Sequence, residues 1–356
     1  TAELTDPLST DRALQRILKL AFYDAGTAAR GGEPPWGALT GVRPVKIPTK
    51  AMLAGAGPAQ AERLLRDTYR VTEGRRRLAM DCAGASLAAL RSLAPGEVSL
   101  YVGIPFCPTR CAYCSFVSAD VGRTLKLVEP YLQLLLEEVD ATGKALHDAG
   151  LTVRSFYMGG GTPTTLSADQ LDRLLTRCEQ SLPLGDCIEY TVEAGRPDTI
   201  TREKLAVLSR HKIGRISINP QTLEDQVLQA IGRRHRAGDI QAAFSLAREV
   251  GFDCVNMDLI AGLPRDSFEG FCRSLEGVLA MGPENITVHT LALKKGSTLM
   301  ERRDVIPDGD QVAGWAKAAM AWANGAGLIS GMGDNTLAPR GQAAVILMGL
   351  DKLAGL

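Results

Sequence analysis

The chain has 356 residues, with 40 Lys and Arg against 40 Asp and Glu, so its formal net charge is zero at pH 7. That balance argues against a general polyanion partner, and nucleic acid is therefore not an expected ligand. Eight cysteines are too few for a disulfide scaffold at this length and are typical of a reducing cytosol. We find no signal peptide and no apolar run long enough to span a membrane, which predicts a cytoplasmic protein.

Residues 1–95 lack strand signals and predict an N-terminal helical region. Residues 11–23 place apolar side chains at helical spacing, and two further helices are expected over 59–69 and 73–93. The dipeptide Pro95-Gly96 is a strong breaker and marks the expected boundary of this region.

Residues 96–295 alternate between strand and helix patterns. Strands are expected over 98–104, 155–158, 188–193, 215–219, 254–260 and 285–293, and helices over 125–147, 168–181, 202–210, 240–250 and 268–279. Units of this kind predict a parallel sheet with right-handed crossovers. Six strands are fewer than the eight of a closed barrel, so the predicted fold class is α/β, an open partial (β/α)6 barrel. Its chemistry is expected at the carboxyl ends of the strands.

A loop after the first predicted strand holds three cysteines, Cys107, Cys111 and Cys114, within eight residues. Three thiolates from one loop can hold three irons of a [4Fe-4S] cluster and leave the fourth iron for a small molecule. Zinc is the rival metal, but a structural zinc site needs four ligands, and neither Cys82 nor Cys178 lies close by in sequence. Three incidental core cysteines are the remaining alternative, although this clustered spacing favours a metal or redox role.

The motif Cys-x-x-x-Cys-x-x-Cys, with the aromatic Tyr113 before its last cysteine, resembles the cluster loop of the radical S-adenosylmethionine (SAM) enzymes. The resemblance implies a [4Fe-4S] cluster whose open iron chelates SAM, and a one-electron cleavage that yields a 5'-deoxyadenosyl radical. The motif Tyr-x-x-Ile-Pro-Phe-Cys, which begins at Tyr101, is specific to a smaller set of proteins. It resembles the oxygen-independent coproporphyrinogen III oxidase group with its HemN, HemW and HemZ types. Residues 39–44, Leu-Thr-Gly-Val-Arg-Pro, resemble the HemZ type.

The same resemblance implies cofactor-binding roles for residues near the predicted strand ends. They are Tyr101, Tyr113, Gly160, Gly161, Thr162, Glu193, Gln221, Arg233, Asp258 and Ala292. The glycine run after the second strand can bring backbone amides close to a ligand, which suits the family segment that cradles the SAM amino group. Asp258 lies inside an apolar strand and needs a partner, either a ligand hydroxyl or amine or a structural arginine. Arg234 and His235, beside Arg233, are interpreted as a solvated basic face.

Three positions depart from the family pattern. Phe116 stands where the HemN type has a fourth cysteine, and this is the wording of the HemW and HemZ types. Arg196 replaces the Asn or Asp that family members often have before the proline, and Pro220 lies in a segment that commonly reads Gly-Val-Gln. After about residue 300 the resemblance fails. Residues 296–356 are expected to form a short helical extension that resembles a surface-layer homology motif from about residue 312.

These observations leave four functional hypotheses. The first is a radical SAM oxidoreductase of haem biosynthesis that decarboxylates porphyrinogen propionates, with a tetrapyrrole substrate and an electron donor such as flavodoxin or ferredoxin. The second is a haem carrier of the HemW type that keeps the cluster. A tRNA-modifying radical SAM enzyme is the third, but only Cys82 lies upstream to serve a further cluster and no basic stripe with interleaved aromatics is visible. The fourth is a non-functional chimera, to which only the tail points.

Overall fold

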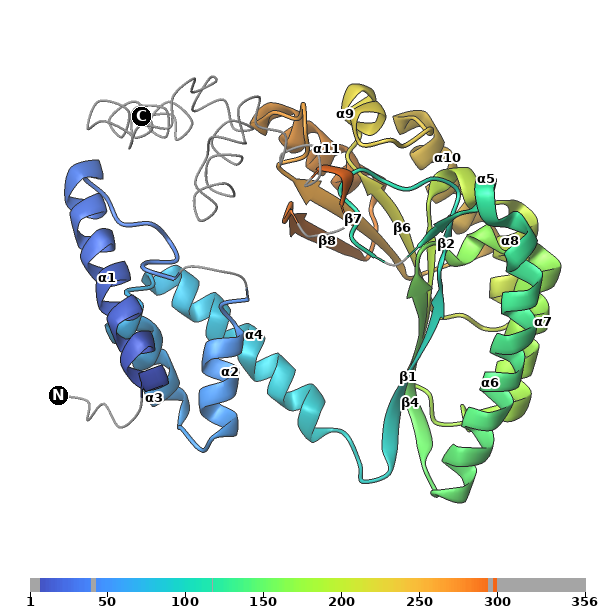
Figure 1. Cartoon of the computed structure of the whole chain (residues 1–356), viewed down its shortest axis with the longest axis horizontal. Helices are drawn as coiled ribbons and strands as arrows, with labels where there is room; N and C mark the ends of the chain where they lie inside the picture. The colour runs from blue at the N-terminus through green and yellow to red at the C-terminus, as the bar shows by residue number, and fades with distance from the viewer. Residues whose placement is uncertain (1–6, 40–42, 117, 294–296, 300–356) are drawn as a thin grey trace. The chain divides into compact units, whose positions relative to one another are not determined.

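The computed structural model describes residues 7–39, 43–116, 118–293 and 297–299. It divides into two units, Thr1–Pro95 and Gly96–Leu356 (Figure 1). Apart from residues 297–299, the predicted C-terminal extension lies outside the described residues, and its surface-layer-like motif lies wholly outside them. No helix in the described ranges is both long and apolar enough to cross a membrane.

The first unit is helical. It contains α1 (Pro7–Arg30), α2 (Lys46–Leu53), α3 (Pro58–Arg63), the π-helical turn η1 (Leu64–Thr68) and α4 (Glu73–Arg91). Helix α1 is longer than the sequence indicated, and α2 was not predicted. The core is small and centres on Leu65, Val71 and Ala79. Gly37 has φ +60°, and a Cβ at this position would lie 2.2 Å from the Tyr69 carbonyl oxygen, so only glycine lets the two loops meet there.

The second unit is built on a six-stranded parallel sheet with the order β1-β4-β5-β6-β7-β8. Its strands are β1 (Glu97–Ile104), β4 (Thr152–Gly160), β5 (Glu189–Gly195), β6 (Arg215–Gln221), β7 (Val255–Ala261) and β8 (Asn285–Thr290). The order leaves β1 and β8 as open edges. The predicted α/β class and partial (β/α)6 barrel are therefore confirmed.

Five long helices connect the strands as the periodicity indicated. They are α6 (Val128–Asp148), α7 (Ala168–Ser181), α8 (Arg202–Arg210), α10 (Ala237–Val250) and α11 (Phe268–Met281). Figure 1 shows α6, α7 and α8 together along one side of the sheet. Side chains of Ser167, Thr201 and Ser267 cap α7, α8 and α11 by accepting backbone N–H bonds. Helices α10 and α11 end at Gly251 and Gly282, both in the left-handed conformation.

Several short elements had no clear sequence signal. Strands β2 (Phe106–Cys107) and β3 (Ala119–Asp120) pair in parallel beside the cysteine loop. Helix α5 (Val121–Thr124), the 3-10 turns η2 (Leu125–Leu127), η3 (Pro163–Thr165) and η4 (Pro197–Thr199), and helix α9 (Asp225–Ala230) complete the unit. Because all six main strands run parallel, their carboxyl ends meet at one edge of the sheet, and most predicted site residues lie at or near that edge.

Candidate functional site

The cysteine loop is fastened to the sheet edge by backbone hydrogen bonds. The Gly161 and Thr162 amides, just beyond β4, donate to the Ile104 and Phe106 carbonyls, each at 2.8 Å. On the other side of the loop the Ala112 amide donates to the Ile231 carbonyl at 2.9 Å, and the Ala112 carbonyl accepts from the Leu299 amide at 3.0 Å. Segments far apart in sequence thus fix the loop between the first and last parts of the unit.

The three loop thiols influence one another. Cys111 is buried, whereas Cys107 and Cys114 are half-buried. Burial raises the pKa of the Cys114 thiol, and the nearby Cys111 and Cys107 raise it further. In the described part of the chain no three metal-ligating side chains converge on one ion position. A [4Fe-4S] cluster takes one thiolate per iron, and the three thiols on this short loop match that requirement.

The glycine segment lies directly against the cysteine loop. Gly160 has φ +109°, and a Cβ on Gly161 would lie 2.6 Å from the Phe106 carbonyl oxygen and 3.0 Å from Cys107 Sγ. The Thr162 hydroxyl also donates to Cys107 Sγ at 3.5 Å. Only a backbone without side chains fits here, and it presents a cradle next to the first thiol of the motif.

Glu193, at the end of β5, is held by its neighbours in the sheet. Its Oε1 accepts a hydrogen bond of 2.6 Å from the Tyr157 hydroxyl, and the Gly160 amide also donates to it. Burial raises the pKa of the Glu193 carboxyl, and Asp258 contributes to the rise. The ring of Tyr101 stacks on Tyr157 with centroids 5.9 Å apart. Tyr157 was not predicted from the sequence, although strand register places it opposite Tyr101.

Gln221 and Arg233 each carry a buried polar atom that lacks a partner among the described residues. Gln221 ends β6 with φ +70°, is 6% exposed, and its Oε1 accepts no hydrogen bond there. The Arg233 Nη1 donates to the Asn219 carbonyl and Nη2 to the Tyr113 hydroxyl at 3.2 Å, but its Nε is unpaired. Arg233 and Tyr113 also lie beside the Cys111 thiol. The structure thus brings two of the predicted residues, Arg233 and Tyr113, together beside Cys111.

Asp258 has a partner that the sequence reading did not consider. Its Oδ1 accepts a hydrogen bond of 2.7 Å from Asn256 Nδ2, so neither a ligand nor an arginine is needed to orient it. Asn256 also donates to the Ser217 hydroxyl and accepts from the Thr287 hydroxyl. Ala292 follows β8 and is exposed.

The interpretation of His235 as part of a solvated face is wrong. Arg234 is exposed, but the His235 side chain is 1% exposed and lies 3.6 Å from the Asp198 carboxylate. Alternation explains the difference, because Arg233 and His235 point inward while Arg234 points outward. Arg196, noted in the sequence only as a departure from the family pattern, is also buried.

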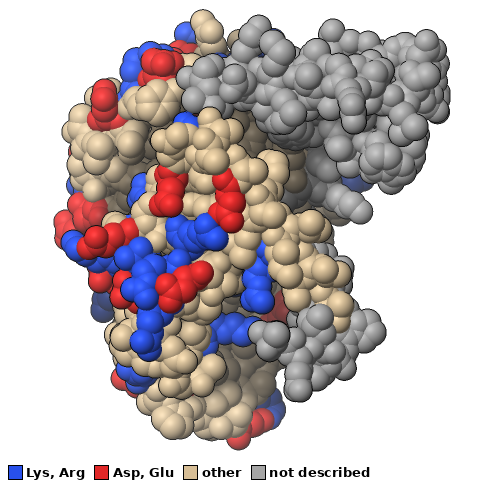
Figure 2. All heavy atoms as spheres, turned by 90° about the vertical axis from the view of Figure 1, so that its left-hand side faces the viewer, with Lys and Arg blue, Asp and Glu red and all other residues tan. Residues whose placement is uncertain are grey.

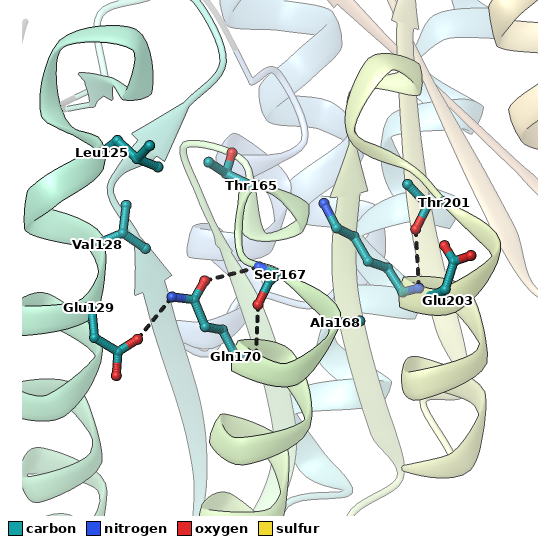
Figure 3. Close-up of a pocket in the computed structure, with 10 residues that line it drawn as sticks. Leu125, Val128, Glu129, Thr165, Ser167, Ala168, Gln170, Thr201 and Glu203 are labelled. Atoms are coloured by element: carbon teal, nitrogen blue, oxygen red, sulfur yellow. Dashed lines mark hydrogen bonds between the residues drawn. The ribbon is translucent and has the colours of Figure 1, made fainter.

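A hollow of this unit lies elsewhere, between the start of α6 and the starts of α7 and α8 (Figure 3). Its polar side chains already bond one another: Gln170 Nε2 donates to Glu129 at 2.9 Å, and Ser167 caps α7. We therefore assign the site to the strand ends rather than to this hollow. On the face shown in Figure 2, acidic and basic side chains are interspersed, in keeping with the zero net charge.

Comparison with known proteins identifies two families. Residues 101–275 match the radical SAM superfamily, and residues 305–343 match the S-layer homology domain. The oxygen-independent coproporphyrinogen-III oxidase-like protein HemZ of Bacillus subtilis is 38% identical over 87% of this chain and 63% of its own length. The heme chaperone HemW of the same organism is 35% identical over 55% of this chain and 51% of its own.

A solved structure shares the fold. Coproporphyrinogen III oxidase (HemN) from Escherichia coli, described as a radical SAM enzyme, aligns with TM-score 0.53 and 30% identity over 62% of this chain and 50% of its own. The chain thus spans between half and two thirds of the length of these relatives. The glycine cradle, the clustered thiols and the orphaned buried oxygen of Gln221 fit a [4Fe-4S] cluster with SAM, the cofactors of the matched family.

Proposed function

The chain belongs to the radical SAM superfamily, within the group of HemN, HemW and HemZ, and we propose that it oxidatively decarboxylates propionate side chains of a porphyrinogen. The observation that carries this proposal is the meeting, at one sheet edge, of the three-cysteine loop, the glycine cradle against Cys107 and the half-buried carboxylate of Glu193. The 38% identity to the HemZ protein supports the choice of substrate class.

In this proposal Cys107, Cys111 and Cys114 hold the cluster. When bound, the cluster and SAM supply a one-electron cleavage that yields a radical able to abstract hydrogen. The Arg233 guanidinium lies beside Cys111 and would place its positive charge next to the cluster. The Glu193 carboxylate would accept hydrogen bonds from the cationic amino group of SAM, and the side-chain-free backbone after β4 would leave room for that group beside Cys107.

Other predicted residues would position the rest of SAM. Gln221 Oε1 is free to accept a hydrogen bond from a ligand, which would remove the cost of its unpaired burial. Asp258, held by Asn256, would accept from a ligand hydroxyl. Tyr101 and Tyr113 would flank the cofactor, and exposed Ala292 would contact it from the end of the sheet.

The experiment is anaerobic reconstitution with iron and sulfide, followed by mass analysis of products from SAM and coproporphyrinogen III. We expect 5'-deoxyadenosine together with a vinyl product. A variant with all three loop cysteines changed to Ala should bind no cluster and cleave no SAM under dithionite. If this variant still cleaved SAM, the assignment would be wrong.

A haem carrier of the HemW type is the second candidate. Phe116 stands at the position of the fourth HemN cysteine, and the similarity to the heme chaperone HemW covers more than half of the chain. Haem titration of the reconstituted protein separates the two functions. Tight haem binding without a vinyl product would favour the carrier.

We further propose a cytoplasmic protein that receives electrons from a flavodoxin or ferredoxin. All eight cysteines are free thiols, which suits a reducing compartment. The S-layer homology match points instead toward the cell surface. Fractionation of cells producing the full-length protein would decide, and recovery with the cell wall would contradict the cytoplasmic proposal.

A further inference from the structure

A buried arginine contacts the middle of the cysteine loop from the end of β5. Arg196 is 3% exposed. Its Nη1 donates two hydrogen bonds to Thr109, one to the carbonyl oxygen at 3.1 Å and one to Oγ1 at 2.6 Å. Its Nε and Nη2 donate to the two carboxylate oxygens of Asp198, each at 3.0 Å. The guanidinium therefore joins a carboxylate on one side to the loop on the other.

Thr109 lies midway between Cys107 and Cys111, so its position affects both thiols. Its hydroxyl accepts from Arg196 and donates its own proton to the Gly232 carbonyl at 3.3 Å. The residue that follows Gly232, Arg233, lies beside Cys111. Thr109 thus connects the β5 end, the segment after β6 and the cysteine loop through one hydroxyl.

The backbone around Arg196 has a defined conformation that fixes where the side chain begins. The register of β5 against β6 shifts between Glu193 and Gly195, which is a bulge that changes the direction of the chain. Gly195 has φ +69°. The Arg196 carbonyl then accepts from both the amide and the hydroxyl of Thr199, at 3.0 and 2.8 Å. The Arg196 side chain therefore extends from a turn that is held by hydrogen bonds.

The charges around Arg196 hold the side chain in place. Burial opposes ionisation of Asp198, but the hydrogen bonds from Arg196 and the nearby His235 ring outweigh it and keep the pKa of Asp198 well below its usual value. A paired carboxylate fixes the planar guanidinium bidentately, and lysine cannot reproduce that geometry. With Nε and Nη2 fixed on Asp198, the Nη1 group faces Thr109.

We propose that Arg196, clamped by Asp198, is a positioning residue that sets the spacing of the Cys107 and Cys111 thiols through Thr109. This inference rests on the proposed cluster at the loop. Residues that orient metal ligands from one step away typically change metal retention about 10- to 100-fold when mutated. The clamp should therefore affect how long the cluster is held and its electronic signature, rather than whether the chain folds.

The test compares Arg196→Gln, Arg196→Lys and Thr109→Val with the wild-type protein after anaerobic reconstitution. The readouts are iron per chain, the rate of cluster loss to a chelator, and the midpoint potential from an EPR-monitored redox titration. We expect Arg196→Gln to lose its cluster about tenfold faster and to show a shifted potential. Thr109→Val should shift both readouts in the same direction, Thr109→Ser should restore them, and Arg196→Lys should not.

Arg202→Gln is the matched control, because Arg202 forms an exposed ion pair with Glu249 on the outer helices. It should leave cluster retention and potential unchanged. If Arg196→Gln does not fold by circular dichroism, Thr109→Val decides alone. Wild-type retention and potential in Thr109→Val would overturn the clamp. A wild-type chain that takes up no cluster would instead overturn the proposed function, so the two failures are distinguishable.

Discussion

The neighbouring strands β6 and β7 differ in how their polar side chains are partnered. At the end of β6, Gln221 adopts a left-handed backbone conformation and buries an oxygen that has no partner among the described residues. In β7, Asp258 is paired with Asn256, which is itself bonded to Ser217 on β6 and Thr287 on β8. The unpaired Gln221 oxygen therefore destabilises the ligand-free chain, whereas the Asp258 carboxylate already accepts a hydrogen bond from the protein itself.

The difference indicates how a ligand would gain affinity at each strand. A buried unpaired acceptor costs about 1–3 kcal/mol, and a strained left-handed residue costs a similar amount, about 1–3 kcal/mol. A ligand donor at Gln221 would recover part of that cost. At Asp258 a ligand gains instead from a carboxylate that is already oriented. Four predictions test this comparison.

The largest effect, on cluster content, is expected where the glycine cradle meets the cysteine loop. Residues of β6 and β7 can bind SAM in the proposed way only if the cluster is held in this loop. Gly161→Ala would place a methyl group against the Phe106 carbonyl and Cys107 Sγ. We expect most of the iron to be lost after reconstitution. Gly185→Ala is the control, because a Cβ there meets nothing within 4 Å. Full cluster content in Gly161→Ala would show that the loop can move away at little cost.

The next effect concerns the Glu193 carboxylate, which Asp258 of β7 influences electrostatically. Glu193→Gln keeps an acceptor for the Tyr157 hydroxyl but removes the charge. We expect SAM to bind more weakly by about 1.5–3 kcal/mol, the usual worth of a hydrogen bond to a charged group. Equilibrium binding of SAM to the reconstituted protein measures this loss. Unchanged affinity would remove Glu193 from the site.

The same variant gives a pH dependence in the cluster-free chain. Burial raises the pKa of Glu193, so over an interval of pH the folded chain keeps a proton that the unfolded chain has lost. This contribution to stability is fully present below the unfolded pKa and is lost as pH rises through the folded pKa. Glu193→Gln should therefore melt above the wild type at neutral pH, and the gap should close on acidification. A constant gap across pH would contradict the raised pKa.

A third prediction contrasts the two strands directly. Asn256→Leu leaves Asp258 and Thr287 without their partner, and we expect the free energy of unfolding to fall by about 1–3 kcal/mol. Gln221→Met removes an oxygen that is already unpaired, so the cluster-free chain should be as stable as the wild type or more so. SAM affinity should fall in Gln221→Met. Chemical denaturation and SAM-binding measurements on both variants test this prediction. Equal destabilisation by the two substitutions would contradict the proposed difference between β6 and β7.

The main features of the sheet followed from the sequence because long apolar periods dominate the free energy of such elements. The six strands and five long helices were predicted for this reason, and the cysteine loop from its spacing. Short elements such as α9 and the β2–β3 pair were missed, since tertiary contacts stabilise them more than local pattern does. The S-layer match after residue 305 agrees with the expected resemblance of the tail.

Side-chain partners were harder to predict than side-chain positions. Asn256 lies two residues before Asp258, on the same face of β7, so strand alternation could have paired them. The burial of Arg196 had no such signal, because Thr109 lies 87 positions away in sequence. His235 was interpreted as solvated because it follows two arginines, although its pairing with Asp198 depends on two loops meeting.

The smallest expected effect tests whether the Asp258 network extends across three strands. Thr287→Val removes the hydroxyl that donates to Asn256 Oδ1 at 2.9 Å while keeping the shape of the side chain. Asn256 would keep its bonds to Ser217 and Asp258, so the loss should be about 0.5–1.5 kcal/mol of unfolding free energy. Thr290→Val, at the exposed end of the same strand, is the control. If Thr287→Val also weakens SAM binding while Thr290→Val does not, β8 helps to orient the carboxylate. Unchanged stability and affinity would confine the preset network to β6 and β7.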